Sequence, residues 1–195
     1  MKTYYKVLNV DGTPYYGGTS NWHLPTENEP GEWMPEIKNI AMCKRGYHIV
    51  DAAHLVEWLG PAIFVVEPRG QIIKDENKFV CTEARLLRHL KTWNETTQRL
   101  FASDCAEHVL PFFEKLYPND KRPREAIQAA RELISAASAA ASASWSATAS
   151  AGSAAWSARS AAWSAAASAA ASAGSAAEKA WQTKKLMQYL KGVLQ

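Results

Sequence analysis

The stretch AIFVVE, residues 62–67, sets the fold class of the first part of the chain. It is a short run of β-branched and aromatic residues, as in a buried strand, and turn signals flank it on both sides. We therefore predict a strand here, followed by a turn at PRGQ that leads towards QIIK. The runs TYYKVL, residues 3–8, and NKFVCTEARLL, residues 77–87, have the same character and predict two more strands.

A helix is expected between these strands. In VDAAHLVEWLG the apolar residues Ala52, Leu55, Val56 and Leu59 recur at helical spacing, and Gly60-Pro61 ends the pattern. The Pro- and Gly-rich stretch PTENEPGEWMP, residues 25–35, indicates a loop. Residues 1–88 are therefore predicted to form a small α+β module that is rich in strands.

The hydrophobic pattern changes to a helical period between residues 84 and 117. We expect amphipathic helices there, with Ser103 and Asp104 as candidate N-caps of the helix that contains Cys105. YPNDKRP, residues 117–123, indicates a helix end and a restart at Pro123 or Arg124. Residues 89–122 are accordingly treated as a helical connector, and the short link predicts that the next helix packs back on this one.

The third segment, residues 123–195, is dominated by Ala and Ser. Alanine is the strongest helix former, and no proline follows Pro123, so we predict helix in spite of the low complexity. Apart from Ser144, the serines from Ser135 to Ser175 are three or four residues apart, which is the period of an α-helix. The unit ASAGSAA occurs twice, at residues 149–155 and 171–177.

A line of tryptophans and glycines runs beside the serine face of this segment. At 100° per residue these side chains fall on one side of a helix, where large and minimal side chains can interlock with a partner helix. We expect this line to bind a partner protein or a second copy of the chain. Its members are Trp145, Gly152, Trp156, Trp163, Gly174 and Trp181. Two architectures remain open: a single long helix of about 65 residues, or a bundle of helices of about 20 residues each.

Charge and composition exclude several classes of protein. The net charge is only +3, although residues 120–195 carry nine basic and four acidic residues, so we expect no direct nucleic-acid target and at most a weak preference for an acidic partner. Three widely spaced cysteines are typical of a reducing compartment. Neither a signal peptide nor an apolar span of membrane length is recognisable. We expect a protein of the bacterial cytoplasm that has no membrane segment.

Residues that carry reactive chemistry are few. Cys43, His48, Cys105 and His108 are of zinc-ligating types, but their spacings match no zinc signature. Buried cysteines and hydrogen-bonded histidines explain them more simply. We therefore predict no metal, no cofactor and no catalytic residue.

Aromatic side chains in the first module have two interpretations. Tyr16, Trp22, His48 and Trp58 form the candidate lining of a small-molecule pocket in this head module. Aromatic residues also fill the cores of small β-rich modules, and this role is the commoner one.

Two parts of the chain resemble known families. YKVLNVDGTPYYGGTSNWHLP, GEWMPEIKNIAMCKRGYH, WLGPAIFVVEPRGQII and KFVCTEARLLR resemble a domain of unknown function frequent in phage and prophage proteins, in which a Cys-x-x-Gly-x-His element is typical; Cys43, Gly46 and His48 have this spacing. LFASDCAEHVLPFFEKLYPNDKRPREAIQAARE, residues 100–132, resembles the helical core of immunity proteins of bacterial toxin systems. The latter resemblance implies a binder that neutralises another protein, and not an enzyme.

The leading hypothesis is a non-enzymatic protein of phage or bacterial origin that occludes a partner in a conflict system, as an immunity protein or an anti-defence inhibitor. One alternative is a nucleotide or nucleotide-signal binding head whose helices serve oligomerisation. Another is an enzyme, since Gly46-Tyr47-His48, the helix expected at 51–59 and the strand at 62–67 resemble part of ADP-ribosyltransferase folds.

Overall fold

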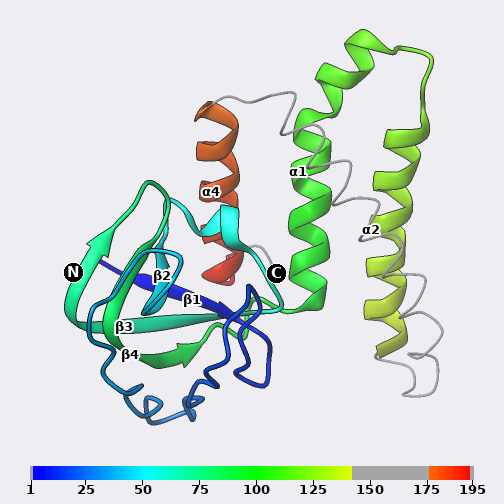
Figure 1. Cartoon of the computed structure of the whole chain (residues 1–195). Coiled ribbons are helices and arrows are strands. Elements are labelled where there is room, and N and C mark those ends of the chain that lie inside the picture. Colours follow the sequence, from blue (N-terminus) through cyan, green and yellow to red (C-terminus); the bar gives the residue numbers. More distant parts are fainter. Residues whose placement is uncertain (1, 142–175, 194–195) are drawn as a thin grey trace. The chain divides into compact units, whose positions relative to one another are not determined.

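The computed structural model describes residues 2–141 and 176–193, which form two compact units (Figure 1). The barrel unit comprises Met1–Asn94 and Thr183–Gln195, and the helical unit comprises Glu95–Gln182. A β-rich first part followed by helices confirms the predicted α+β class.

Several predictions concern residues outside the described ones. The tryptophans and glycines at 145, 152, 156, 163 and 174, and most of the repeated ASAGSAA units, fall within residues 142–175. The choice between one long helix and a bundle also depends on this range and stays open.

Four antiparallel strands close into a barrel in the order β1-β2-β4-β3. They are β1 (Tyr4–Leu8), β2 (Tyr47–Asp51), β3 (Ala62–Lys74) and β4 (Phe79–His89). The long β3-β4 hairpin forms most of the sheet, β1 pairs with the first part of β3, and β2 joins β1 to β4. The predicted strands at 3–8, 62–67 and 77–87 are confirmed, whereas β2 was not predicted.

The interior of the barrel is filled by side chains from all four strands. Leu8, Ile49, Phe64 and Leu86 are each at most 2% exposed, and they belong to one apolar cluster. Because these residues lie far apart in the sequence, the cluster forms only when the strands are correctly paired. Closure of the barrel and formation of its core are therefore one event.

The predicted turn at PRGQ is wrong, because β3 runs through it as a bulge. Pairing with β4 is shifted between Arg69 and Ile72, and Gly70 has φ 78°. The Thr82 hydroxyl accepts a hydrogen bond from the Gln71 amide and donates one to the Arg69 carbonyl, both at 3.1 Å. A Cβ at Gly70 would overlap this hydroxyl, so glycine fits both the conformation and the space.

The helix predicted at 51–59 is also wrong. Asp51 pairs with Tyr4 at the end of β2, and only a four-residue 3₁₀ helix, η1 (Leu55–Trp58), follows. In the turn between them the His54 amide donates to the Asp51 carbonyl at 3.2 Å. Asp51, the first residue of the expected helix, is part of β2 and therefore cannot begin a helix. The apolar residues Leu55 and Leu59 are buried all the same.

The helical unit begins later than the sequence pattern indicates. Helix α1 (Glu95–Leu116) starts eleven residues after the expected onset at 84, because residues up to His89 belong to β4. The N-cap expected at Ser103 and Asp104 does not exist, since α1 is continuous there and Ser103 is fully buried. Because no new helix begins at Ser103, α1 is a single helix of 22 residues.

Helix α2 (Arg122–Ala141) packs beside α1, as the short link predicts (Figure 1). Ala106 and Leu110 of α1 form a buried cluster with Ile127 of α2. Next to it, Arg131 of α2 makes ion pairs with Asp104 at 2.7 Å and Glu107 at 2.5 Å. The expected stop and restart between the helices is confirmed, and the Arg122 amide donates to Asp120 at 3.1 Å.

The last described helix, α4 (Ala176–Leu190), contributes to both units. Its final residues belong to the barrel unit, where the Thr92 hydroxyl donates to the Leu190 carbonyl at 2.8 Å and Leu186 is fully buried. None of the described helices is both long enough and apolar enough to cross a bilayer.

Candidate functional site

A pocket of about 540 Å³ opens in the barrel unit. Its wall is formed by β1 and β2, the loop around Tyr15–Ser20 and the segment around Cys43, together with Trp58 and Lys78. The candidate pocket residues Tyr16, Trp22, His48 and Trp58 all line it. The structure thus brings these four together, while their role in binding stays a prediction.

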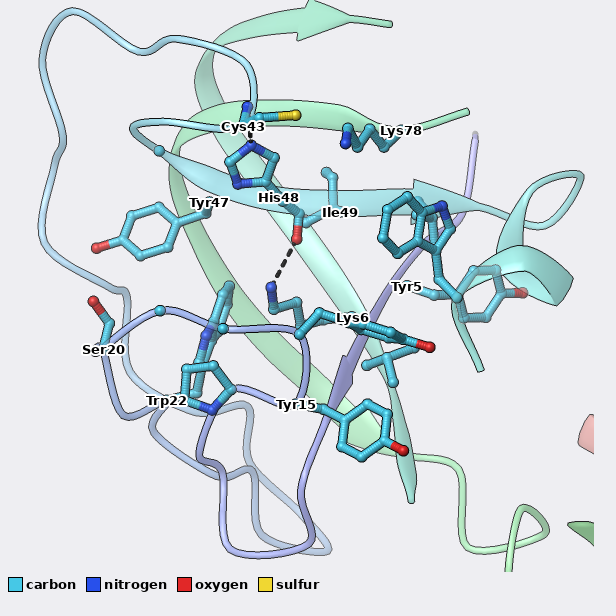
Figure 2. A pocket seen from close by; sticks show the side chains of 18 of the residues that line it. Tyr5, Lys6, Tyr15, Ser20, Trp22, Cys43, Tyr47, His48, Ile49 and Lys78 are labelled. Atoms are coloured by element: carbon cyan, nitrogen blue, oxygen red, sulfur yellow. Dashed lines mark hydrogen bonds between the residues drawn. The ribbon is translucent and has the colours of Figure 1, made fainter. Parts of the chain in front are cut away.

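Lys6 is the most unusual residue of this wall. It lies on β1 with its ammonium 2.9 Å from the His48 carbonyl, to which it donates, and 5.2 Å from the centroid of the Trp22 ring (Figure 2). Burial lowers the pKa of Lys6 from 10.5 to about 8, because a charged amine loses hydration there. The group is therefore mostly charged at neutral pH, at an energetic cost to the folded state.

His48 is held by the backbone. Its Nε2 lies 2.9 Å from the Cys43 amide, which donates to it, so this nitrogen carries no proton and the ring is neutral (Figure 2). Burial, and then the charges of Lys6 and Lys78, lower the pKa of His48 in agreement with that assignment. The ring nitrogen that a base or a metal ligand would use is already occupied.

Three aromatic rings form a second side of the pocket. Tyr16 makes edge contacts with Tyr15 at 4.9 Å and with Trp58 at 5.4 Å between ring centroids. The Tyr16 hydroxyl donates to the Leu59 carbonyl at 2.5 Å, which fixes the ring. Lys78 lies 5.0 Å from the centroid of Trp58. The wall thus combines flat apolar surfaces with cationic groups.

Trp22 fulfils both interpretations made from the sequence. It is only 6% exposed and belongs to the barrel core, where its ring makes an edge contact with Tyr47 at 5.3 Å. The same residue also lines the pocket. A core aromatic can therefore serve as the floor of a pocket in so small a barrel.

The four candidate zinc ligands are divided between the two units. Cys43 and His48 belong to the barrel unit, and Cys105 and His108 belong to the helical unit. Within residues 2–141 and 176–193, no three His, Cys, Asp or Glu side chains are placed to share a metal ion. All three cysteines are free thiols, and burial raises the pKa of the Cys81 thiol to about 12.

A second polar pair lies after β2. The His54 ring is 2.6 Å from the Asp51 carboxylate, which also forms an ion pair with Lys2 at 2.8 Å. Among the described residues, the ring of His54 has Asp51 as its hydrogen-bond partner and no hydroxyl or thiol. The pair clamps the turn that precedes η1.

In the helical unit, Trp181 is engaged by α1. Its ring stacks on His108 at 3.8 Å between centroids with an interplanar angle of 3°. His108 also lies 3.3 Å from the carboxylate of Glu178, one turn earlier on α4. Of the predicted Trp-Gly line, Trp181 is the member that the structure describes, and it packs within its own unit.

The end of α1 carries exposed apolar side chains. Phe112 and Leu116, one helical turn apart, are 67% and 73% exposed, and Tyr117 follows them at 57%. Lys115 and Lys121, which are near them in the sequence, are exposed as well. Contiguous apolar side chains with a charged rim are typical of protein-binding surfaces.

The helical region has a recognisable family. A family model described as "Imm-5 like putative immunity protein" matches residues 88–189, just over half of the chain. The chain belongs to this family. The comparisons with curated proteins and with solved structures found no match.

The Imm-5 like match extends the resemblance predicted for residues 100–132 and confirms it. It contains α1, α2 and the exposed apolar end of α1, whereas the pocket of the barrel unit lies outside it. The likeness of the first 88 residues to a phage domain stays a prediction. The likeness to ADP-ribosyltransferases loses its support, because the helix at 51–59 on which it depended is not formed.

Sequence reasoning identified the aromatic residues of the pocket but missed its lysines. Lys6, Lys44 and Lys78 line it, and none of them was among the predicted pocket residues. A signal existed for Lys6, which stands in the middle of the apolar run YYKVL. A lone cation inside a short apolar strand is worth testing as a pocket residue.

Proposed function

We propose that this chain is an immunity protein that binds and occludes a partner protein of a bacterial conflict system, without catalysing a reaction. The family match over residues 88–189 carries this proposal. The predicted resemblance of the N-terminal part to a phage domain supports an origin in a bacterium or its phage, and hence action in the cytoplasm of the host cell.

The exposed end of α1 is our first choice for the partner-binding surface. Phe112 and Leu116 present apolar area to solvent at a helix end that the family match includes. Burying two such side chains in an interface contributes several kcal/mol at about 25 cal/mol per Å². The neighbouring Lys115 and Lys121 favour a partner whose contact surface is apolar with an acidic rim.

The predicted Trp-Gly line is the competing surface. Trp145, Trp156 and Trp163, with Gly152 and Gly174, belong to residues outside the described part of the chain. Trp181 is stacked on His108. We retain this line as a proposed surface for a partner protein or for a second copy of the chain.

The test combines capture of the partner protein with a growth assay for its toxicity. The tagged full chain is used to capture proteins from bacterial lysates, and each captured protein is then expressed alone and together with the chain. A partner of an immunity protein should arrest growth when expressed alone, and co-expression should restore growth. Should no captured protein be toxic, or should co-expression fail to relieve toxicity, the proposed function is wrong.

Variants of the full chain locate the surface in the same assay. The Phe112→Ser, Leu116→Ser double variant should lose both capture and growth rescue. Val10→Ser is the matched control, since Val10 is equally exposed at 67% but lies in the barrel unit. Rescue that survives the double variant and fails after Trp156→Ala, Trp163→Ala would move the binding surface to the Trp-Gly line.

A further inference from the structure

The barrel pocket has an unbalanced charge. Lys6, Lys44 and Lys78 line it, and among the described residues on its wall there is neither Asp nor Glu. Its volume of about 540 Å³ falls in the range of small-molecule sites, which is roughly 300–1,000 Å³. A concave, cationic and aromatic wall of this size needs an explanation that the helical family match does not supply.

Lys6 supplies the strongest part of the argument. A buried ammonium is costly unless an anion or several acceptors compensate it, and no described carboxylate forms an ion pair with this one. Among the described residues its acceptor is the His48 carbonyl, and an ammonium has three N–H donors. Two donors are therefore available to a bound anion.

The pocket loop at Gly17 and Gly18 carries two further backbone N–H groups. Gly17 and Gly18 line the pocket with φ angles of 89° and 110°. In the part of the chain that the structure describes, neither of their amides is hydrogen-bonded to another backbone group. A side chain at Gly17 would meet no neighbouring atom within 4 Å, so the loop leaves room for a ligand.

The rings determine the rest of the ligand. The Tyr16 ring contacts both Tyr15 and Trp58 edge to face, and its hydroxyl donates to the Leu59 carbonyl, which holds the ring in place. Fixed aromatic rings at the wall of a pocket bind planar, apolar groups by stacking and edge contacts. The pocket therefore offers an anion subsite next to a planar-ring subsite.

We propose that the barrel pocket binds a small aromatic anion, a planar ring that bears a phosphate or a carboxylate. The anionic group is bound by Lys6 and Lys78, and the ring lies against Tyr15, Tyr16 and Trp58. This site is separate from partner binding by the helical unit and does not depend on it. His48 stays neutral and orients Lys6 through its carbonyl, so the site binds its ligand and does not transform it.

Calorimetric titration of the full chain tests the proposal. The probes are adenosine 5′-monophosphate and indole-3-acetate, each with its neutral counterpart, adenosine and indole-3-acetamide, together with inorganic phosphate. At least one aromatic anion should bind about tenfold more tightly than both its neutral counterpart and inorganic phosphate. The two anions distinguish a phosphate ligand from a carboxylate ligand.

Lys6→Met should weaken binding of that anion by at least about tenfold. Lys74→Met is the matched control, because Lys74 is exposed on β3 and does not line the pocket, and it should leave binding unchanged. If circular dichroism shows that Lys6→Met is unfolded, Lys78→Met replaces it and should weaken binding several-fold.

Two results would overturn the proposal. The first is that neither aromatic anion binds at millimolar concentration or exceeds its neutral counterpart. The second is that the folded lysine variants bind as the wild type does. Neither result bears on growth rescue, so failure of this site and failure of the proposed immunity function are distinguishable.

Discussion

The barrel unit and the helical unit are stabilised by contacts of different range. In the barrel, Tyr4 pairs with Val66 and Phe64 with His89, so its core requires segments far apart in the sequence. In the helical unit, α1 packs on α2, its immediate successor. Long-range pairing makes the barrel core cooperative, whereas a helix hairpin is assembled from locally formed parts.

The two units also differ in what each offers to other molecules. The barrel encloses a pocket with cationic and aromatic walls, and the family match lies almost entirely outside it. The helical unit exposes apolar side chains on a convex helix end. Concave sites suit small molecules and exposed apolar surfaces suit proteins, and for this reason we propose a separate kind of ligand for each unit.

The largest difference between the two units is expected in the free energy of unfolding after a buried side chain is truncated. Phe64→Ala should lower the free energy of unfolding by about 3–5 kcal/mol, because the ring is 2% exposed and packed from all strands. Ile127→Ala, in the α1-α2 contact, should cost about 2–4 kcal/mol. Urea denaturation followed by circular dichroism measures both. Phe112→Ala, at an exposed position, is the control and should change little; a larger loss for Ile127→Ala than for Phe64→Ala would reverse the comparison.

The pH dependence of the free energy of unfolding should reveal the energetic cost of the charge on Lys6. Its folded pKa of about 8 lies below its ordinary 10.5, so the folded state binds the proton less well than the unfolded state. The penalty is complete below pH 8 and is relieved as the pH rises from 8 to 10.5. His48 and Cys81, which face Lys6, stay neutral through most of this window, since burial lowers the pKa of the first and raises that of the second to about 12.

Relative to Lys6→Met, the wild type should therefore gain at most about 3 kcal/mol between pH 7 and pH 10.5. Urea denaturation of both proteins at several pH values measures this difference. A difference that does not change with pH would show that Lys6 is hydrated in the folded state.

A smaller effect is expected from the ion pairs between the helices. Arg131→Met removes the contacts of α2 with Asp104 and Glu107 and should cost about 1 kcal/mol or less, because the arginine side chain is 35% exposed and solvent screens the charges. Thermal unfolding at low and high salt measures it. The wild type should lose this increment in high salt while Arg131→Met should not, and an equal response would assign the effect to packing.

The smallest effect is expected at the barrel surface. Lys91 lies 2.7 Å from Glu27, but their side chains are 72% and 80% exposed. Exposed ion pairs contribute little because water and salt screen them. Lys91→Ala should leave the melting temperature unchanged within error, and a clear decrease would mean that this pair restrains the loop that carries Glu27.

The sequence predicted more of the secondary structure than of its boundaries. AIFVVE and KFVCTE are strands, and their composition and length leave no good alternative. Residues 84–93 fit a helix as well as a strand, and the pairing of Leu86 with Val66 decides for the strand. VDAAHLVEWLG likewise has helical spacing, but its first residues are taken by the pairing of Asp51 with Tyr4. Local patterns cannot report such distant partners.

The candidate pocket was only half predictable for the same reason. Aromatic residues such as Trp58 and Tyr16 attract notice by type alone. Lys6 becomes unusual only when β1 closes the barrel and its ammonium comes to lie beside the His48 carbonyl. The prediction of a turn at PRGQ was wrong for a similar reason. Thr82, on the neighbouring strand β4, stabilises a bulge at Gly70 in place of the turn.

Closure of the four strands restricts how the barrel unit can associate. An open sheet ends in strands whose unpaired backbone groups can accept an additional strand from another molecule, which leads to peptide capture or aggregation. The four described strands each have two neighbours in the ring. Over Ala62–Val66, β3 has β1 on one side and β4 on the other, so a foreign strand finds no free edge there. Addition of a strand is restricted to the end of β3, Glu67–Lys74, which pairs with β4 alone.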